Sequence, residues 1–282
     1  MSSCFNGGAG WPEPVVRVQA VSDSCGATIP ERYVKAPSER PSSLGGGGGL
    51  NNIPVVDMSM PDGEETARAV AAACREWGFF QAVNHGVWRG FFQQPMEVKQ
   101  RYGNSPATYE GVNFYPRCPQ PELTLGVASH SDPGGMTMLL VDDHVRGLQV
   151  KNAGHWITVD PVLDAFIVNI GDQIQVLSNA VYKSVEHRVT VSAAEERLSL
   201  AFFYNPRSDL PLAPMPELVA PPARPALYPP MTFDEYREHI RRRGLSGKAQ
   251  LQSQQMATAI CGAPPAATAS SSSSSSASSL AR

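Results

Sequence analysis

Two side chains that can bind a metal ion stand one residue apart in the segment SHSDPGGMTMLL, which begins at Ser129. On a strand, residues i and i+2 project from the same face, so His130 and Asp132 are predicted to point at one spot. An imidazole and a carboxylate at one spot supply two of the three ligands of a metal site. By itself the pair is weak evidence, because H-x-D also arises where a histidine merely neighbours a turn-forming aspartate.

A third ligand is predicted at His187, in the segment YKSVEHRV. There Val185, His187 and Val189 alternate onto one face of a strand, and this is the face expected to line the core. Two histidines and one carboxylate bind one face of a ferrous ion and leave its other positions open for a co-substrate and oxygen. The same ligands can hold zinc, but a zinc hydrolase also needs a general base, and the chain has no H-E-x-x-H motif.

A carboxylate-binding pair is predicted in the segment RLSLAFFYNP, where Arg197, Ser199 and Phe203 fall on one face of a strand. Arginine and serine two residues apart offer a bidentate cation and a hydroxyl to a single carboxylate. A dianionic oxo-acid also balances the charge of a ferrous ion, one aspartate and one arginine. Asn113 and Tyr115 share a face in VNFYP and can contact the same acid. The alternative is a surface Arg-x-Ser and a core tyrosine.

Short strands must position these side chains. From Val112 onward, turns separate seven segments whose spacing is typical of an antiparallel sandwich or barrel such as a jelly roll. The segments are VNFYP, MTMLLV, GLQVKN, WITVDP, AFIVNIGD, YKSVEHRV and RLSLAFFYNP. A strand at IPVVDM and another at FFQAVNHG are predicted before them, with a helix between the two that begins at a capping box, Asp62-x-x-Glu65, and ends at Gly78. A last helix is predicted to begin at the capping box TFDE and to run to Gly244.

Composition excludes several classes of partner. The 282 residues carry a formal net charge of −3 and no basic block, so we expect no nucleic acid partner. No apolar run is long enough to span a bilayer, and the first residues lack a signal pattern, so we expect no membrane partner. The five cysteines form no C-x-x-C pair, which indicates reduced thiols and argues against a zinc finger. We therefore expect a cytoplasmic protein, with the nucleus as a second compartment. The oligomeric state stays open.

The segments together resemble the plant 2-oxoglutarate- and iron(II)-dependent dioxygenases, the class that includes anthocyanidin synthase. The resemblance covers most of residues 53–206 and rests on IPVVDM, WGFFQAVNHG, NFYPRCPQPELTLG, HSDPGGMTMLL, DAFIVNIGDQIQVLSN, YKSVEHRV and RLSLAFFYNP. Within the class, three further segments resemble the jasmonate-induced oxygenases, also called jasmonic acid hydroxylases. These segments are VVRVQAVSDS, ATIPERYVKAPSERP and FFYNPRSDLPLAPMPELV.

The resemblance implies a mainly β fold, a double-stranded β-helix (jelly roll) with an α/β N-terminal lead-in and a C-terminal helix. It implies that Fe(II) is held by His130, Asp132 and His187. It implies that 2-oxoglutarate is held by Arg197, Ser199, Asn113 and Tyr115. In the implied reaction O₂ is consumed, 2-oxoglutarate is converted to succinate, and an unactivated C–H bond of the prime substrate is hydroxylated, with ascorbate in a supporting role.

A substrate carboxylate clamp is predicted at Arg237 and Arg241, four residues apart on the last helix beside an apolar stripe. The alternative is that cations late in a helix only interact with its dipole. The resemblance favours the clamp and jasmonic acid as substrate, with hormone inactivation as the outcome. A flavonoid substrate and a catalytically impaired form are the rival interpretations. Phe203 lies on the inward face and is predicted to contact substrate, although core packing accounts for it equally well.

One departure from the family matters most, although the segment after VNHG is also short. In the family, long helices follow the stretch like MEVKQRYGNSPATYEG, whereas here Gly111 runs directly into Val112. A basic residue that the relatives place just before VNFYP is replaced by Gly111. Without those helices the chain is expected to be less stable or to expose an apolar sheet face.

We divide the chain into five parts on these grounds. They are a flexible N-terminal extension (1–52), a truncated N-terminal dioxygenase region (53–111), the jelly-roll core (112–206), a C-terminal segment and helix (207–245) and a disordered Ser-rich tail (246–282). In the extension, VVRVQAV is predicted to add a short strand or helix.

Overall fold

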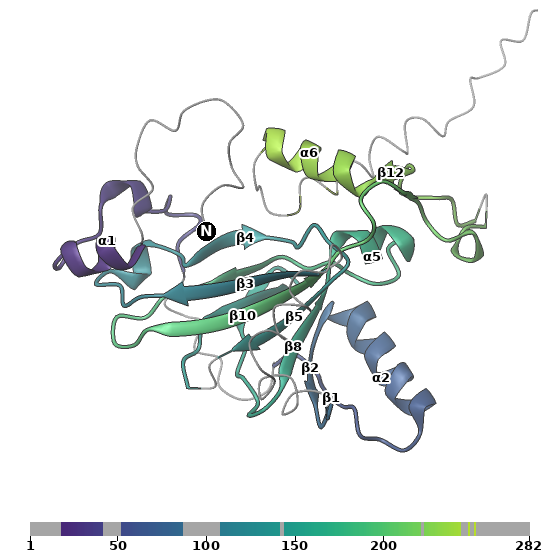
Figure 1. Cartoon of the computed structure of the whole chain (residues 1–282), viewed down its shortest axis with the longest axis horizontal. Coiled ribbons are helices and arrows are strands. Elements are labelled where there is room, and N and C mark those ends of the chain that lie inside the picture. The colour runs from purple at the N-terminus through teal and green to yellow at the C-terminus, as the bar shows by residue number, and fades with distance from the viewer. Residues whose placement is uncertain are drawn as a thin grey trace, which may run out of the picture.

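Two facing sheets form the body of the protein (Figure 1). The computed structural model describes residues 18–41, 52–86, 108–141, 144–220 and 223–243, together with Lys248 and Leu251. The larger sheet has the order β1-β2-β8-β5-β10-β3 and the smaller one the order β4-β9-β6-β7. Strands β1 and β2 pair in parallel and the other pairs in these sheets are antiparallel.

The strands have the following bounds. The larger sheet contains β1 (Val55–Asp57), β2 (Phe79–Val83), β3 (Thr108–Tyr115), β5 (Met136–Val141), β8 (Phe166–Ile170) and β10 (Arg197–Tyr204). The smaller sheet contains β4 (Val127–His130), β6 (Leu148–Asn152), β7 (His155–Thr158) and β9 (His187–Val189). A separate hairpin-like pair joins β11 (Pro211–Leu212) to β12 (Met231–Thr232).

The helices lie around this body. The α-helices are α1 (Val18–Ser24), α2 (Gly63–Glu76), α5 (Asp172–Leu177) and α6 (Phe233–Arg243). The short 3₁₀ helices are η1 (Glu31–Tyr33), η2 (Pro121–Leu123) and η3 (Pro216–Leu218). Within the described residues no helix has the length and apolar character needed to cross a bilayer.

The core sits between the two sheets, as expected for a jelly roll. One buried cluster draws Phe79 and Ile167 from the larger sheet and Leu148, Val150 and Val189 from the smaller one. A second cluster fills the space between α2 and the opposite face of β1, β2 and β8. The predicted fold class is therefore confirmed: a mainly β jelly roll with an α/β lead-in and a C-terminal helix.

The predicted helix boundaries follow from their caps. Asp62 caps α2 by accepting a hydrogen bond from the Glu64 backbone N–H at 2.8 Å. At the other end, Gly78 has a φ of +65°, and a Cβ there would lie 2.3 Å from the Lys183 carbonyl oxygen, so only glycine fits. Ahead of α6, Thr232 and Glu235 bond reciprocally, side chain to backbone N–H, which is the predicted capping box.

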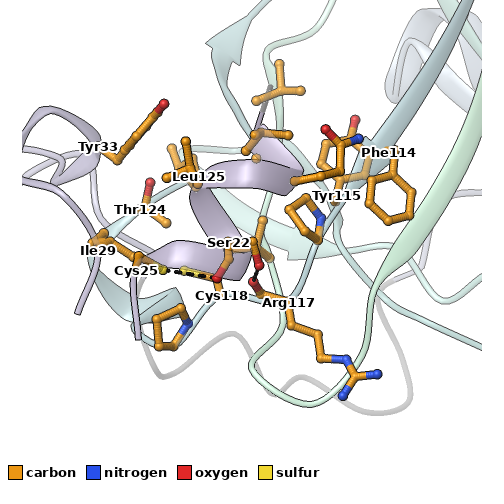
Figure 2. A pocket seen from close by; sticks show the side chains of 18 of the residues that line it. Ser22, Cys25, Ile29, Tyr33, Phe114, Tyr115, Arg117, Cys118, Thr124 and Leu125 are labelled. Atoms are coloured by element: carbon orange, nitrogen blue, oxygen red, sulfur yellow. Dashed lines mark hydrogen bonds between the residues drawn. The ribbon is translucent and has the colours of Figure 1, made fainter. Parts of the chain in front are cut away.

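Part of the stretch predicted to be flexible packs on the roll. The Ser22 hydroxyl in α1 donates to the Arg117 carbonyl at 2.8 Å, and the Lys35 N–H donates to the Leu123 carbonyl at 2.8 Å. A cavity of about 470 Å³ lies between this segment and the roll, and Figure 2 shows the side chains that line it. The predicted disordered tail lies outside the described residues except for Lys248 and Leu251, and Leu251 is buried beside Val176.

The outer face of β3 and β10 is apolar and partly open to solvent. Leu198 pairs with Phe114 and Leu200 with Val112 across the two strands. Val112 is 69% exposed and Leu198 is 46% exposed. Residues that alternate with them, such as Ser199, point inward instead. An exposed apolar sheet face is the consequence expected from the missing helices.

Candidate metal and co-substrate site

Three potential metal ligands meet at the end of the smaller sheet. His130, the last residue of β4, lies opposite His187 in the antiparallel pairing with β9. Asp132 Oδ1 lies 3.5 Å from Nε2 of His130 and 3.6 Å from Nε2 of His187. The ligand atoms of all three residues lie within 4.8 Å of one another, so a single ion can reach them all.

Asp132 reaches this point in a different way from the one the sequence suggested. The prediction placed His130 and Asp132 on one strand face, but β4 ends at His130 and Asp132 lies in the loop that follows. Thr137 and Asn169, which are partners across β5 and β8, both donate to Asp132 Oδ2, Asn169 at 2.8 Å. With Oδ2 held in this way, Oδ1 faces the two histidines.

Thr137 and Asn169 were not identified from the sequence. Their signal was a polar residue at an inward position of an otherwise apolar strand, in MTMLLV and in FIVNI. Both are buried, with 5% and 4% of their surface exposed. Because buried polar side chains are nearly always hydrogen-bonded, such positions indicate a partner in the interior.

Backbone carbonyls orient both histidine rings. His130 Nδ1 lies 2.8 Å from the Ala128 oxygen, and His187 Nδ1 lies 3.2 Å from the Val185 oxygen. A carbonyl only accepts, so each Nδ1 carries a proton and each Nε2 faces Asp132. In a metal-binding histidine, the ring nitrogen that does not bind the metal usually donates a hydrogen bond in this way, which fixes the orientation of the ring.

Burial and mutual charge shift the protonation of the three groups. Burial alone would raise the pKa of Asp132, but His187 and His130 outweigh it and lower that pKa. Burial and then the charge of His130 lower the pKa of His187 to about 4. For His130 burial works in the lowering direction, yet its hydrogen bond to Asp132 raises the pKa. At neutral pH Asp132 is therefore ionised and His187 neutral, the forms that bind metal.

A cavity of about 120 Å³ joins the three ligands to the predicted co-substrate residues. Arg197 and Ser199, both buried, line it from β10, and Asn113 and Tyr115 line it from β3. The Arg197 guanidinium carbon lies 5.3 Å from the centre of the Tyr115 ring. Phe203 lines the same cavity. All four residues predicted to hold 2-oxoglutarate thus open into the space that holds the ligands.

The residues present fit both groups. Two imidazole nitrogens and a carboxylate oxygen on one side of a point form the donor set that suits ferrous iron. A buried guanidinium and a hydroxyl from neighbouring inward positions suit a dianionic acid, because a buried carboxylate needs a charge partner and hydrogen bonds.

The predicted substrate clamp lies elsewhere. Arg237 and Arg241 are not among the residues that line the cavity. Arg237 forms an ion pair with Asp234 on its own helix, and Arg241 pairs with Glu238 at 2.7 Å. Their side chains are 45% and 66% exposed. Both arginines therefore sit on the surface of α6 in local ion pairs.

Comparisons with known proteins agree with this geometry. Residues 100–206 match the 2OG-Fe(II) oxygenase superfamily, and residues 53–116 match the N-terminal domain of non-haem dioxygenases of morphine synthesis. Jasmonate-induced oxygenase 1 of Arabidopsis thaliana is 40% identical, over 87% of this chain and 88% of the relative. Flavanone 3-dioxygenase 2 of Oryza sativa subsp. japonica is 33% identical, over 80% of this chain and 94% of the relative.

A solved structure is similar over most of the chain as well. The crystal structure of JOX2 in complex with 2OG, Fe and JA has a TM-score of 0.72 and 40% sequence identity, and the match covers 87% of this chain and 99% of that one.

The length of the alignment shows that this chain is shorter than the relative inside the aligned region. It extends over 351 residues in the comparison with Jasmonate-induced oxygenase 1, although the chain has only 282 residues and 87% of them take part. The relative therefore has residues inside the aligned region that this chain lacks.

Proposed function

The chain belongs to the 2OG-Fe(II) oxygenase superfamily, and from this premise we propose that its substrate is a small carboxylated metabolite, jasmonic acid. The observation that carries the oxygenase activity is the meeting of His130, Asp132 and His187 beside a buried arginine and serine in one cavity. We assign iron to these three ligands. Arg197 and Ser199 bind the distal carboxylate of 2-oxoglutarate, and the β3 residues facing them complete its pocket.

Each residue has a physical task in this scheme. Bound ferrous iron supplies the activation of O₂ that couples succinate formation to hydroxylation. Thr137 and Asn169 hold Asp132 in one rotamer, so its free oxygen stays directed at the ligand position. Arg197 offsets the charge of the co-substrate in a cavity shielded from water. Tyr115 packs beneath the guanidinium and limits its movement.

The substrate assignment rests on similarity. Relatives named for jasmonate are 38–41% identical to this chain, compared with 33% for the flavanone enzyme. On this proposal Arg237 and Arg241 exchange their partners Asp234 and Glu238 for the substrate carboxylate. A flavonoid lacks that carboxylate, so replacing either arginine by glutamine would weaken jasmonate turnover and leave flavonoid turnover unchanged.

We expect the chain to be an impaired form of this enzyme. Gly111 shares the inward phase of Asn113 and Tyr115, so a side chain at 111 would face the cavity. A Cβ at Gly111 would meet Phe203 at 3.5 Å, an ordinary contact, so a larger residue has room to extend. The basic residue expected there by resemblance is missing, and with it one charge partner for the substrate.

The test is a turnover assay on the full chain with Fe(II), 2-oxoglutarate and ascorbate. Succinate and hydroxylated product are measured with jasmonic acid, with a flavanone and with no prime substrate. The proposal predicts succinate in all arms and a stimulation by jasmonic acid only. Succinate formation that a flavanone stimulates and jasmonic acid does not would favour the flavonoid alternative, and no succinate in any arm would contradict the proposed activity.

A further inference from the structure

A buried carboxylate stands directly behind the iron-ligand loop and takes no part in the site described above. Asp172 begins α5 and has none of its surface exposed. Its Oδ2 accepts a hydrogen bond from the Tyr236 hydroxyl of α6 at 2.6 Å and one from Ser131 at 3.3 Å. Ser131 is the residue between His130 and Asp132. One carboxylate oxygen thus joins the C-terminal helix to the iron-ligand loop, which directly follows His130 and carries Asp132.

Backbone N–H groups at and beside Asp172 also donate hydrogen bonds to the same loop. The Asp172 N–H donates to the carbonyl of Asp132 at 2.8 Å. Its two chain neighbours, Gly171 and Gln173, donate to the carbonyls of Gly135 and Gly134 at 2.7 and 2.9 Å. Three successive N–H groups at the start of α5 therefore fix the course of the ligand-bearing loop.

Tyr236 lies on the side of α6 that packs against the rest of the protein. It has 1% of its surface exposed, and Phe233, on the same side of the helix, has 2%. Its hydroxyl finds its partner in Asp172, which lies 64 residues away in the chain. Because the bond is buried and one partner is a carboxyl group, it is stronger and more directional than a bond at the surface.

We propose that the Tyr236–Asp172 hydrogen bond is a positioning link that fixes where α6 lies relative to the iron-ligand loop. Asp172 and Tyr236 are positioning residues in this scheme, because neither touches the ligand position. The inference rests on the proposed function in that it takes the loop to carry iron ligands. Its consequence is reciprocal: metal binding at the loop orders α6, and loosening α6 weakens metal binding by the same factor.

The chain offers a matched control for the test. Tyr228 is as buried as Tyr236, at 1% exposed, and its hydroxyl also has a buried partner, the amide of Gln175 at 2.8 Å. It does not bond to Asp172. Tyr228→Phe and Tyr236→Phe therefore remove the same atom from similar surroundings, but only the second cuts the link.

The experiment measures Mn²⁺ affinity by titration in the presence of 2-oxoglutarate, and hydrogen exchange of residues 233–243 with and without Mn²⁺. We expect Tyr236→Phe to weaken Mn²⁺ binding about 3- to 10-fold, the effect of one hydrogen bond, and to abolish the protection of α6 by Mn²⁺. Asp172→Ala, which removes the acceptor, should weaken Mn²⁺ binding at least as much, and adding Tyr236→Phe to it should weaken binding no further. Tyr228→Phe should keep the parent affinity even where its melting temperature falls.

Two results would overturn the link. Parent-like Mn²⁺ affinity in Tyr236→Phe would show that the hydrogen bond from α6 does not affect metal binding at the loop. An equal loss in Tyr228→Phe would mean that general destabilisation explains the effect. If the parent chain itself fails to bind Mn²⁺, the assignment of the metal ligands fails as well, whereas normal binding by the parent and by Tyr236→Phe together contradicts the link alone.

Discussion

His130 and His187 stand opposite each other in the antiparallel pairing of β4 and β9, and their ring centres lie 4.3 Å apart. The chain between them forms β5 to β8 and α5, so the two ligands meet only in the completed roll. An ion held by both histidines and by Asp132 therefore ties two strands to the loop after β4. Metal binding should be linked to the stability of the whole roll.

Removing one ligand tests that linkage. Asp132→Ala should lose metal binding, because a set of three ligands has no spare, while exposed Asp209, which is ion-paired with Arg207, can be replaced by alanine without effect. Mn²⁺ at a hundredfold excess over its dissociation constant should stabilise the parent by about 2.7 kcal/mol. Metal analysis under argon and thermal melts are the measurements. Stoichiometric metal in Asp132→Ala would refute the ligand assignment.

The co-substrate residues should contribute unequally. Arg197→Ala should weaken 2-oxoglutarate binding by on the order of 2–4 kcal/mol, because it removes a buried charge partner of a carboxylate. Ser199→Ala should cost about 1 kcal/mol, the value of one hydrogen bond. Leu198→Ala, on the outward face of the same strand, is the control and should leave binding unchanged. Calorimetric titration with Mn²⁺ present measures all three, and equal losses for Arg197→Ala and Ser199→Ala would place the acid elsewhere.

The tight approach of α5 to the ligand loop gives a prediction about stability. A Cβ on Gly171 would lie 2.3 Å from the carbonyl oxygen of Gly134, so Gly171→Ala must displace backbone. We expect a loss of roughly 2 kcal/mol or more in the free energy of unfolding. Gly63→Ala is the control, since a Cβ there meets nothing within 4 Å, and it should be neutral or stabilising by up to about 1 kcal/mol. Urea denaturation compares the two variants. An unchanged midpoint for Gly171→Ala would mean that the loop can move away from α5 at little cost in free energy, contrary to the prediction.

The open face of β3 and β10 should make the chain prone to self-association. Threonine keeps strand propensity while reducing apolar surface, so the double variant Val112→Thr and Leu198→Thr should stay soluble at higher concentration. Its free energy of unfolding should change little, because both side chains lie on the exposed face of the sheet. Light scattering during concentration measures the effect. Identical scattering for parent and variant would show that this face does not drive association.

Much of the site could be predicted from the sequence because strand periodicity carries it. The inward positions of β10 and β3 follow from simple alternation, and the structure places Arg197, Ser199, Asn113 and Tyr115 around one cavity. The capping-box motifs also predicted the helix caps at Asp62 and Thr232.

Other features could not be predicted from local pattern. Asp132 lies beyond the end of its strand, and its orientation depends on Thr137 and Asn169, which come together only when β5 pairs with β8. The helix α5 has six residues, too few for a clear helical period. The surface ion pairs of Arg237 and Arg241 depend on which acidic neighbours the side chains meet, and helical spacing does not specify that.

The most direct measurement compares succinate with hydroxylated jasmonate, side by side, in this chain and in a chain with the missing helices restored from a relative between Gly111 and Val112, with a basic residue before Val112. The ligands and the co-substrate pocket are complete, so both proteins should bind iron and 2-oxoglutarate. The unaltered chain should form succinate weakly with little or no hydroxylated product, and the restored chain should form the two in equal amounts. Tight one-to-one coupling in the unaltered chain would contradict this account.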